Sequence, residues 1–289
     1  MNMIIFDFLC VTVSLCLIEF ENAMKVVILA GGYGTRFGKA TDFLPKPMIP
    51  IGPFPILWHI MRGYSHYGHN DFVLCTGYKS EMIKEFFANA EIYANDFTVD
   101  YSGDGSPKRT VHRVTGFKPR VTIAYTGQDT MTGARLKRVQ KYLGNDKEFL
   151  LTYGDGVVDL NVNELIDFHH AHGKIATLTG VFPPPKFGDL KMDENRVTDF
   201  AEKEGKQGAL VNGGFYVFKR DIFDYLDDDS GCVLEKNPMQ RLATEGELMA
   251  YKHAGFWQCM DTTRDLEGLQ KMWVTGQAPW KLWTDDYKD

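Results

Sequence analysis

The alternation of short apolar runs with longer helix-period segments constrains the fold of this chain more than any other feature. Runs typical of buried strands cover residues 25–29, 71–76 and 121–125. Residues 55–66 place their apolar side chains on one helical face, and Ser80 is predicted to cap a helix through residue 90. Strand–helix–strand units of this kind predict an α/β fold with a mixed, mainly parallel sheet.

A fourth strand is predicted at residues 149–152, and Gly154-Asp155-Gly156 lies just past its carboxyl end. A helix that follows Thr132 and is closed by Gly144 precedes it. Open α/β sheets bind ligands outside the carboxyl ends of their strands, so we expect a functional site at Asp155. The second half of the chain is less regular, with a long strand at 209–218 and short strand patterns, and it predicts a smaller β-rich part.

Both ends of the chain are predicted to lie outside the folded domain. Residues 1–23 precede a second methionine, Met24, which the first strand follows immediately, so they are expected to be an extension. Their apolar stretch, residues 3–18, is shorter than the roughly 20 residues of a membrane span and lacks the positive charge of a signal peptide. We therefore expect one domain at 24–283, a polar tail at 284–289 and no membrane segment.

Charge and cysteine content exclude several classes of protein. Among the 289 residues, 32 Lys and Arg against 38 Asp and Glu give a net charge of −6, without the broad basic footprint of a nucleic-acid binder. The five cysteines contain no C-x-x-C pair, which argues against a disulfide framework or a structural zinc site and favours the cytoplasm. Because the net charge is negative, an anionic ligand must be held by a local cluster of basic residues.

A glycine-rich segment, Gly31-Gly32-Tyr33-Gly34-Thr35-Arg36, follows the first predicted strand. Glycines let backbone N–H groups approach an anion closely, and threonine and arginine add donors and charge. The segment matches neither the G-x-G-x-x-G spacing nor the Walker loop, so a tight turn also explains it when it is taken alone. Downstream, Pro45 and Pro47 restrict the backbone on both sides of Lys46, which suits a lysine that contacts phosphate.

Together, the first strand, the GGxGTR segment and Lys46-Pro47-Met48 resemble the signature of the sugar-nucleotide pyrophosphorylases, the nucleotidyltransferases that act on sugar 1-phosphates. Further segments are similar to the glucose-1-phosphate cytidylyltransferase branch of that family, at residues 55–61, 130–138, 152–157, 212–215 and 255–258. The resemblance implies a Rossmann-like core with a smaller sugar-binding part. It also implies a Mg²⁺-dependent reaction of CTP with α-D-glucose 1-phosphate that gives CDP-glucose and pyrophosphate for dideoxysugars of surface polysaccharide. A homo-oligomer, such as a hexamer, is implied as well.

This chemistry needs cations more than a general base. A sugar phosphate has a second pKa of about 6 and is already ionised at neutral pH, so catalysis consists of aligning two anions and stabilising the leaving pyrophosphate. The resemblance assigns Arg36 and Lys46 to catalysis, and Asp155 and Asp261 to Mg²⁺. Without the resemblance, Asp261 is equally explained as the N-cap of a helix beginning near Thr263.

The resemblance also assigns the binding residues. Those for the nucleotide are Leu29, Gly31, Gly32, Gly34, Thr35, Arg36, Thr132, Gly133, Arg135 and Asp155. Those for the sugar phosphate are Tyr153, Gly188, Glu202, Lys203 and Asn212. Arg135 can donate to O2 or N3 of cytosine but not to its N4 amine, and a solvated helix face shared with Lys137 and Arg138 is the alternative.

Three points leave alternatives open. Glu204 stands where the family's sugar-phosphate motif usually has proline, which loosens the backbone at Lys203 and brings a carboxylate near a phosphate. Base choice depends on a few hydrogen bonds, so the same reaction with UTP or dTTP is the nearest alternative. A non-catalytic regulatory subunit is a second one, although the presence of Arg36, Lys46 and both metal-site aspartates argues against it.

Overall fold

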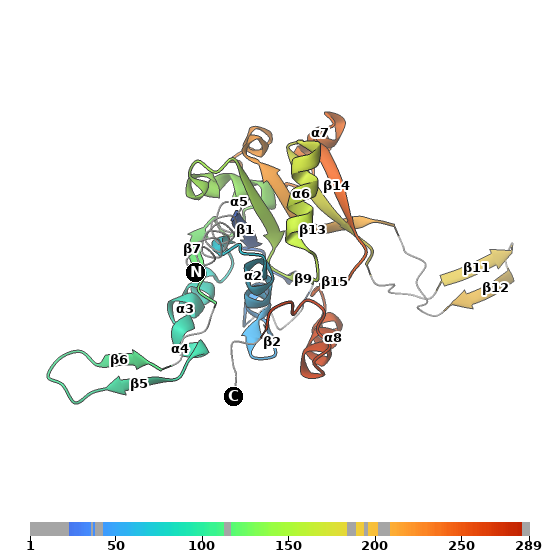
Figure 1. Cartoon of the computed structure of the whole chain (residues 1–289). Helices are drawn as coiled ribbons and strands as arrows, with labels where there is room; N and C mark the ends of the chain where they lie inside the picture. Colours follow the sequence, from blue (N-terminus) through green and yellow to red (C-terminus); the bar gives the residue numbers. More distant parts are fainter. Residues whose placement is uncertain are drawn as a thin grey trace, which may run out of the picture.

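A seven-stranded sheet forms the centre of the molecule, in a computed structural model that describes residues 23–35, 37, 43–112, 117–183, 189–193, 196–201 and 209–284 (Figure 1). The strands follow the order β14 (Leu248–His253), β10 (Ala176–Val181), β13 (Val211–Lys219), β8 (Glu148–Tyr153), β1 (Lys25–Ala30), β4 (Asp71–Thr76) and β7 (Arg120–Tyr125). Neighbours are parallel except at β13, which is antiparallel to both β8 and β10. The predicted mixed, mainly parallel sheet is confirmed.

Helices cover both faces of the sheet, so alternate residues of β1 pack in two separate cores. Val26 and Ile28 pack in one core with α2 (Ile56–His66), α3 (Ser80–Ala88), α6 (Val162–His172) and α8 (Thr263–Val274). Val27 and Leu29 pack in the other with α5 (Thr132–Val139), α7 (Asn237–Thr244) and the 3-10 helices η3 (Gln140–Leu143) and η4 (Arg220–Tyr225). β1 is therefore buried on both sides, as its continuous apolar run predicts.

Small paired elements surround this body. β9 (Gly156–Val158) pairs antiparallel with β15 (Trp257–Cys259), and β2 (Pro50–Ile51) pairs with β3 (Phe54–Pro55). Two hairpins extend outward in Figure 1: β5 (Phe97–Asp100) with β6 (Lys108–Val111), and β11 (Asp189–Asp193) with β12 (Arg196–Ala201). The 3-10 helix η2 (Lys46–Met48) and the short helix α4 (Ala90–Ala94) complete the described elements.

The helix after β4 begins differently from the prediction. Ser80 is not its N-cap: Lys79 holds that position in the left-handed region, with φ of 50°, and makes no side-chain capping bond. The Ser80 hydroxyl is buried and lies 2.8 Å from the hydroxyl of Thr76 at the end of β4. The hydroxyl thus ties the helix to the strand instead of capping it, and α3 ends at Ala88.

The predicted N-terminal extension lies outside the described residues apart from Ala23, and the predicted tail lies outside them apart from Thr284. Within the part of the chain that the structure describes, no helix combines the length and the apolar character needed to cross a membrane.

Candidate active site

A cavity of about 590 Å³ opens where the carboxyl ends of β1 and β8 lie side by side. The two strands pair in parallel with Leu29 opposite Tyr153, so the loops that follow them meet at one edge of the sheet. The predicted site residues that line the cavity are Leu29, Gly31, Gly32, Gly34, Thr35, Lys46, Thr132, Arg135, Tyr153, Asp155, Asn212 and Asp261. The fold therefore brings segments from most of the chain's length to one place.

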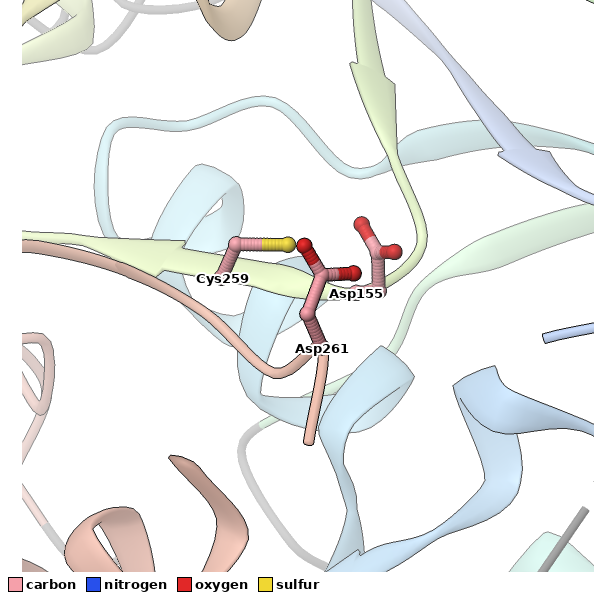
Figure 2. A group of neighbouring side chains, drawn as sticks. All are labelled: Asp155, Cys259 and Asp261. Atoms are coloured by element: carbon pink, nitrogen blue, oxygen red, sulfur yellow. The ribbon is translucent and has the colours of Figure 1, made fainter. Parts of the chain in front are cut away.

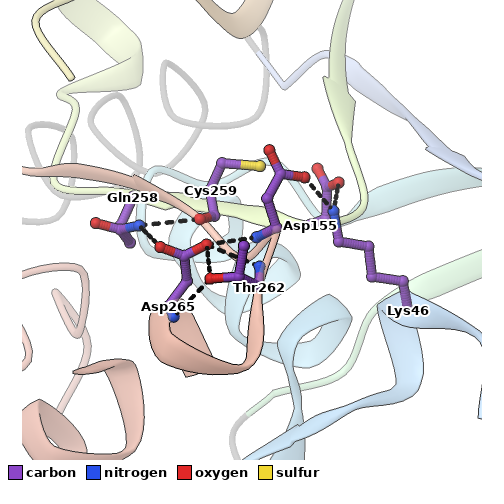
Figure 3. A network of polar contacts seen from close by, with 7 residues as sticks. Lys46, Asp155, Gln258, Cys259, Thr262 and Asp265 are labelled. Carbon is purple, nitrogen blue, oxygen red and sulfur yellow. Dashed lines mark hydrogen bonds and ion pairs between the residues drawn. The ribbon is translucent and has the colours of Figure 1, made fainter. Parts of the chain in front are cut away.

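Lys46 is one of the charged residues that line this cavity. The two flanking prolines and the 3-10 turn η2 hold its backbone, and the residue is only 7% exposed. Its Nζ donates to Asp155 at 2.6 Å and to Asp261 at 2.7 Å (Figure 3). Burial alone would lower the pKa of Lys46, but the two carboxylates outweigh it and hold that pKa above its usual value.

Asp155 and Asp261 converge because β9 and β15 pair. Asp155 follows β8 and precedes β9, and the Asp155 carbonyl accepts from the Met260 N–H at 2.9 Å. Asp261 then precedes α8, whose N-cap is Thr262 in a reciprocal capping box with Asp265. The alternative role of Asp261 as the helix cap is therefore wrong, since its carboxylate contacts Lys46 while its neighbour caps the helix.

A sulfur donor lies beside the two carboxylates. Ligand atoms of Asp155, Cys259 and Asp261 all lie within 4.8 Å of one another (Figure 2). Burial, together with the charge of Asp155, raises the pKa of the Cys259 thiol. Two convergent carboxylates are the donor set that a hard divalent cation needs when phosphates supply further ligands, so these residues fit the predicted metal.

The Arg135 side chain supports the glycine-rich loop by donating to the Gly31 carbonyl. A Cβ at Gly31 would lie 2.2 Å from the Arg135 guanidinium and 2.9 Å from the Gly77 backbone nitrogen, so a larger residue there would displace the hydrogen-bonded Arg135 side chain. Gly34 has φ of 66°, a conformation that favours glycine, and its carbonyl accepts from the Phe37 N–H at 2.9 Å. The loop thus depends on glycine for space at one position and for backbone conformation at another. Arg36 lies outside the described residues.

Arg135 is buried, at 4% exposure, rather than on a solvated helix face, so that alternative is wrong. Its terminal nitrogens donate to five oxygens at 2.7–3.1 Å: the carbonyls of Gly31, Thr76, Gly127 and Gln128 and the hydroxyl of Thr126. Because protein oxygens occupy these donors, the geometry supports a role in holding the loops. Direct donation to a base stays a prediction.

Glu235 joins the nucleotide and sugar parts of the predicted site and was missed by sequence reasoning. It accepts from the Thr132 hydroxyl at 2.6 Å and from the Tyr153 hydroxyl, and it lines the cavity. Burial, and secondarily Tyr216 and Glu235, raises the pKa of Tyr153, which therefore stays a protonated donor. No motif or regular spacing marks Glu235, because it lies in an irregular segment between η4 and α7.

Asn212 and Gly133 are the remaining predicted residues that the structure describes. Asn212 lines the cavity and donates to the Tyr216 hydroxyl at 2.5 Å. Gly133 is not among the residues that line the cavity, and its N–H donates to the Cys232 carbonyl. A Cβ at Gly133 would lie 2.7 Å from the Cys232 sulfur. The predicted phosphate and sugar contacts of Gly188, Glu202 and Lys203, together with the departure at Glu204, lie outside the described residues.

The family comparison agrees with this geometry. The family model described as "Nucleotidyl transferase" matches residues 25–271, so the chain belongs to the nucleotidyl transferase family. Enzymes of this family generally use a divalent metal.

Individual relatives are more specific. The chain is 49% identical over 260 residues to the glucose-1-phosphate cytidylyltransferase of Salmonella typhi, a match that covers 90% of this chain and all of the relative. It is 43% identical, with the same coverage, to a probable glucose-1-phosphate cytidylyltransferase of Bacillus subtilis. A mannose-1-phosphate guanyltransferase of Saccharomyces cerevisiae is 27% identical over 84% of this chain and 62% of the relative.

Solved structures share the fold. A putative glucose-1-phosphate thymidylyltransferase from Bacillus anthracis superimposes with a TM-score of 0.62 at 17% identity, covering 91% of this chain and 98% of that one. A UDP-glucose pyrophosphorylase in complex with UDP-glucose gives a TM-score of 0.61 at 16% identity, covering 88% and 99%. At these identities the likeness establishes the architecture alone.

Proposed function

We propose that the chain is a glucose-1-phosphate cytidylyltransferase that joins CTP and α-D-glucose 1-phosphate to give CDP-glucose and pyrophosphate. The observation that carries the proposal is the convergence of Lys46, Asp155 and Asp261 beside the glycine-rich loop, in a chain 49% identical to relatives of that name. A cavity of about 590 Å³ is within the size range of small-molecule sites.

The reaction is a direct displacement at the α-phosphorus of CTP. An oxygen of the sugar phosphate forms the new P–O bond, and the bond to pyrophosphate breaks. The attacking phosphate is ionised at neutral pH, so no side chain has to remove a proton. The chain's contribution is to hold two anions in line and to neutralise the charge that develops as pyrophosphate leaves.

Lys46 is the group placed for that neutralisation. Its ammonium sits within 2.7 Å of both carboxylates and remains charged, since its pKa is raised. Substrate phosphates offer further oxygens to the same donor, and we assign Lys46 Nζ to the α-phosphate. Backbone N–H groups of residues 31–35 are assigned to the β- and γ-phosphates, with Arg36 completing that part of the site.

Asp155 and Asp261 are assigned to Mg²⁺. When bound, the ion supplies positive charge to the reacting phosphates, and it prefers oxygen ligands such as these two carboxylates. Asp155 lies between β8 and β9 and directly precedes β9, and the Thr262 capping box fixes the backbone beside Asp261. Both carboxylates are therefore attached to rigid elements.

The sugar and base contacts are assigned to the two sides of Glu235. Tyr153 and Asn212, with Gly188, Glu202 and Lys203, are assigned to the glucose phosphate, and Leu29, Thr132, Gly133 and Arg135 to the cytidine side. Glu235 touches both sides through Tyr153 and Thr132, so we add it as a residue that sets their relative position. Carboxylate oxygens accept hydrogen bonds, which suits sugar hydroxyls or an exocyclic amine nearby.

We further propose a cytoplasmic homo-oligomer, such as a hexamer, that serves dideoxysugar synthesis for surface polysaccharide. Cys75, Cys232 and Cys259 are free thiols among the described residues, which supports a reducing compartment. Sedimentation of the purified chain tests the oligomer: a species heavier than the 32.8 kDa chain is expected, and a monomer at working concentration would contradict it.

Pyrophosphate release with Mg²⁺ tests the function. The assay crosses four nucleoside triphosphates with glucose 1-phosphate and mannose 1-phosphate, because relatives at 27% identity are named mannose-1-phosphate guanyltransferases. We expect the CTP and glucose 1-phosphate pair to give the highest kcat/KM. A higher value for GTP with mannose 1-phosphate would contradict the proposal.

A further inference from the structure

The thiol of Cys259 lies beside the Asp155 and Asp261 carboxylates, and the proposed reaction does not use it. Its Sγ shares the 4.8 Å neighbourhood of the Asp155 and Asp261 oxygens and points toward them (Figure 2). The residue ends β15, whose register places it opposite Gly156. The sulfur is therefore held by strand pairing on the same short sheet that brings the two aspartates together.

A positively charged group already lies beside the Asp155 and Asp261 carboxylates. The Lys46 ammonium lies between the Asp155 and Asp261 carboxylates, at 2.6 and 2.7 Å, and makes up part of their charge. Lys46, Asp155, Cys259 and Asp261 all line the cavity, and the flexible lysine side chain can turn toward a bound substrate phosphate and leave the space between the carboxylates to a divalent cation. Two oxygens and one sulfur then face the ion.

This donor set is mixed in character. Mg²⁺ prefers oxygen ligands, whereas thiolate sulfur selects softer ions, and Zn²⁺ binds sulfur at about 2.3 Å and carboxylate oxygen at about 2.0–2.2 Å. Around a tetrahedral ion with such bonds, sulfur and oxygen lie about 3.6 Å apart. Side chains whose ligand atoms start within 4.8 Å of one another reach that spacing by small rotations.

We propose that Cys259 makes the metal site of this chain a trap for thiophilic divalent cations, which bind through Cys259, Asp155 and Asp261 and displace Mg²⁺. When such an ion binds, a metal–sulfur bond forms, the thiol proton leaves to solvent, and no atom changes oxidation state. The ion blocks nucleotidyl transfer by occupying the position assigned to Mg²⁺. The inference rests on the proposed function in that respect alone.

Cadmium binding to the full-length protein tests the proposal with a readout that does not depend on activity. A sulfur–cadmium bond gives an ultraviolet charge-transfer band, so Cd²⁺ is titrated into wild type, Cys259→Ser, Cys232→Ser and Asp261→Asn. Cys232 is the matched control, because it is also a part-buried free cysteine but lies outside the cluster. Added Mg²⁺ is expected to lower the band in wild type by competition.

We expect the band in wild type and Cys232→Ser, its loss in Cys259→Ser, and an apparent Kd for Cd²⁺, read from the band, that rises at least about tenfold in Asp261→Asn. A band of unchanged intensity in Cys259→Ser would overturn the proposal. So would an unchanged affinity in Asp261→Asn, since the thiol would then bind the ion without the carboxylates.

Turnover of CTP by wild type with Mg²⁺ is measured alongside. Its absence would defeat the proposed function while the cadmium result stands, so the two claims fail separately.

Discussion

At the residue scale, the proposed chemistry is assigned to three charged side chains that contact one another, Lys46, Asp155 and Asp261. Each carboxylate is about a quarter exposed, while the lysine side chain is 9% exposed, so the ammonium depends on both partners for its charge. Removing one partner from such a group leaves a buried charge only partly compensated. The same two carboxylates are the proposed metal ligands, which makes the group sensitive to single substitutions.

Replacing Asp155 by Asn is expected to lower kcat/KM for pyrophosphate release at least about 100-fold, because a metal ligand and a partner of Lys46 are lost together. Asp159→Asn is the matched control, since Asp159 lies near β9 but pairs with His253 at 2.9 Å. Steady-state kinetics with saturating Mg²⁺ decide the matter. An Asp155→Asn enzyme that keeps more than about a tenth of wild-type activity would contradict the assigned role.

Replacing Arg135 by Lys tests the support of the glycine loop. One ammonium cannot reach the five oxygens that the guanidinium bonds, so the loop loosens and we expect KM for CTP to rise about tenfold, with a smaller change in kcat. Arg138→Lys is the control, because Arg138 bonds Thr126, Thr130 and Asp228 but not the loop. Equal KM values for the two variants would refute a positioning role for Arg135.

At the scale of elements, the start of α8 determines where Asp261 lies. Thr262 and Asp265 form a reciprocal capping box, and Asp265 also accepts from the Asp261 N–H at 3.0 Å (Figure 3). The cap thus fixes the backbone of the aspartate as well as the helix. The Asp265 side chain therefore contacts both the cap of the helix and the backbone of the proposed metal ligand.

Thr262→Ala is expected to cost about 1 kcal/mol of unfolding free energy, as loss of an N-cap does, and to raise the Mg²⁺ concentration that gives half-maximal rate. Thr275→Ala, at the other end of α8, removes a hydroxyl that bonds Lys271 and leaves Asp261 untouched. Urea unfolding and a Mg²⁺ titration of rate measure both effects. A Mg²⁺ requirement that shifts equally in the two variants would speak against the link.

The central strands and the residues that follow them could be predicted from sequence, whereas contacts between distant segments could not. Strands β1, β4, β7 and β8 match their apolar runs, and Asp155 lies where a strand end predicts a site. Ser80 and Arg135 differ because tertiary contacts, to Thr76 and to loop carbonyls, outweigh local capping and periodicity. Glu235 and Cys259 were not predicted as site residues, because only the folded chain places them beside the other residues of the cavity.

At the scale of the whole molecule, the fold buries three histidines, His59, His69 and His169, in surroundings that favour their neutral form. Burial lowers the pKa of His59, His69 and His169 to about 4. The unfolded chain has an ordinary histidine pKa of about 6.5, so below that pH it binds more protons than the folded protein does. Stability is therefore present above about pH 6.5 and falls as the pH drops toward 4.

We expect the free energy of unfolding to fall by about 1–2 kcal/mol per buried histidine between pH 7 and pH 5. Urea titrations at the two pH values measure it. His59→Gln should lose less stability across this interval than wild type, whereas His170→Gln, at an exposed site, should behave like wild type. Equal wild-type stability at pH 7 and pH 5 would contradict the buried, neutral state.

An internal competition tests the central claim most directly. Equal concentrations of CTP, UTP and dTTP are mixed with glucose 1-phosphate, Mg²⁺ and the protein, and the nucleotide sugars formed at early times are separated and quantified. Their ratio equals the ratio of kcat/KM values, free of differences between assays. The proposed function predicts that CDP-glucose predominates, and a mixture in which UDP-glucose or dTDP-glucose predominates would contradict it.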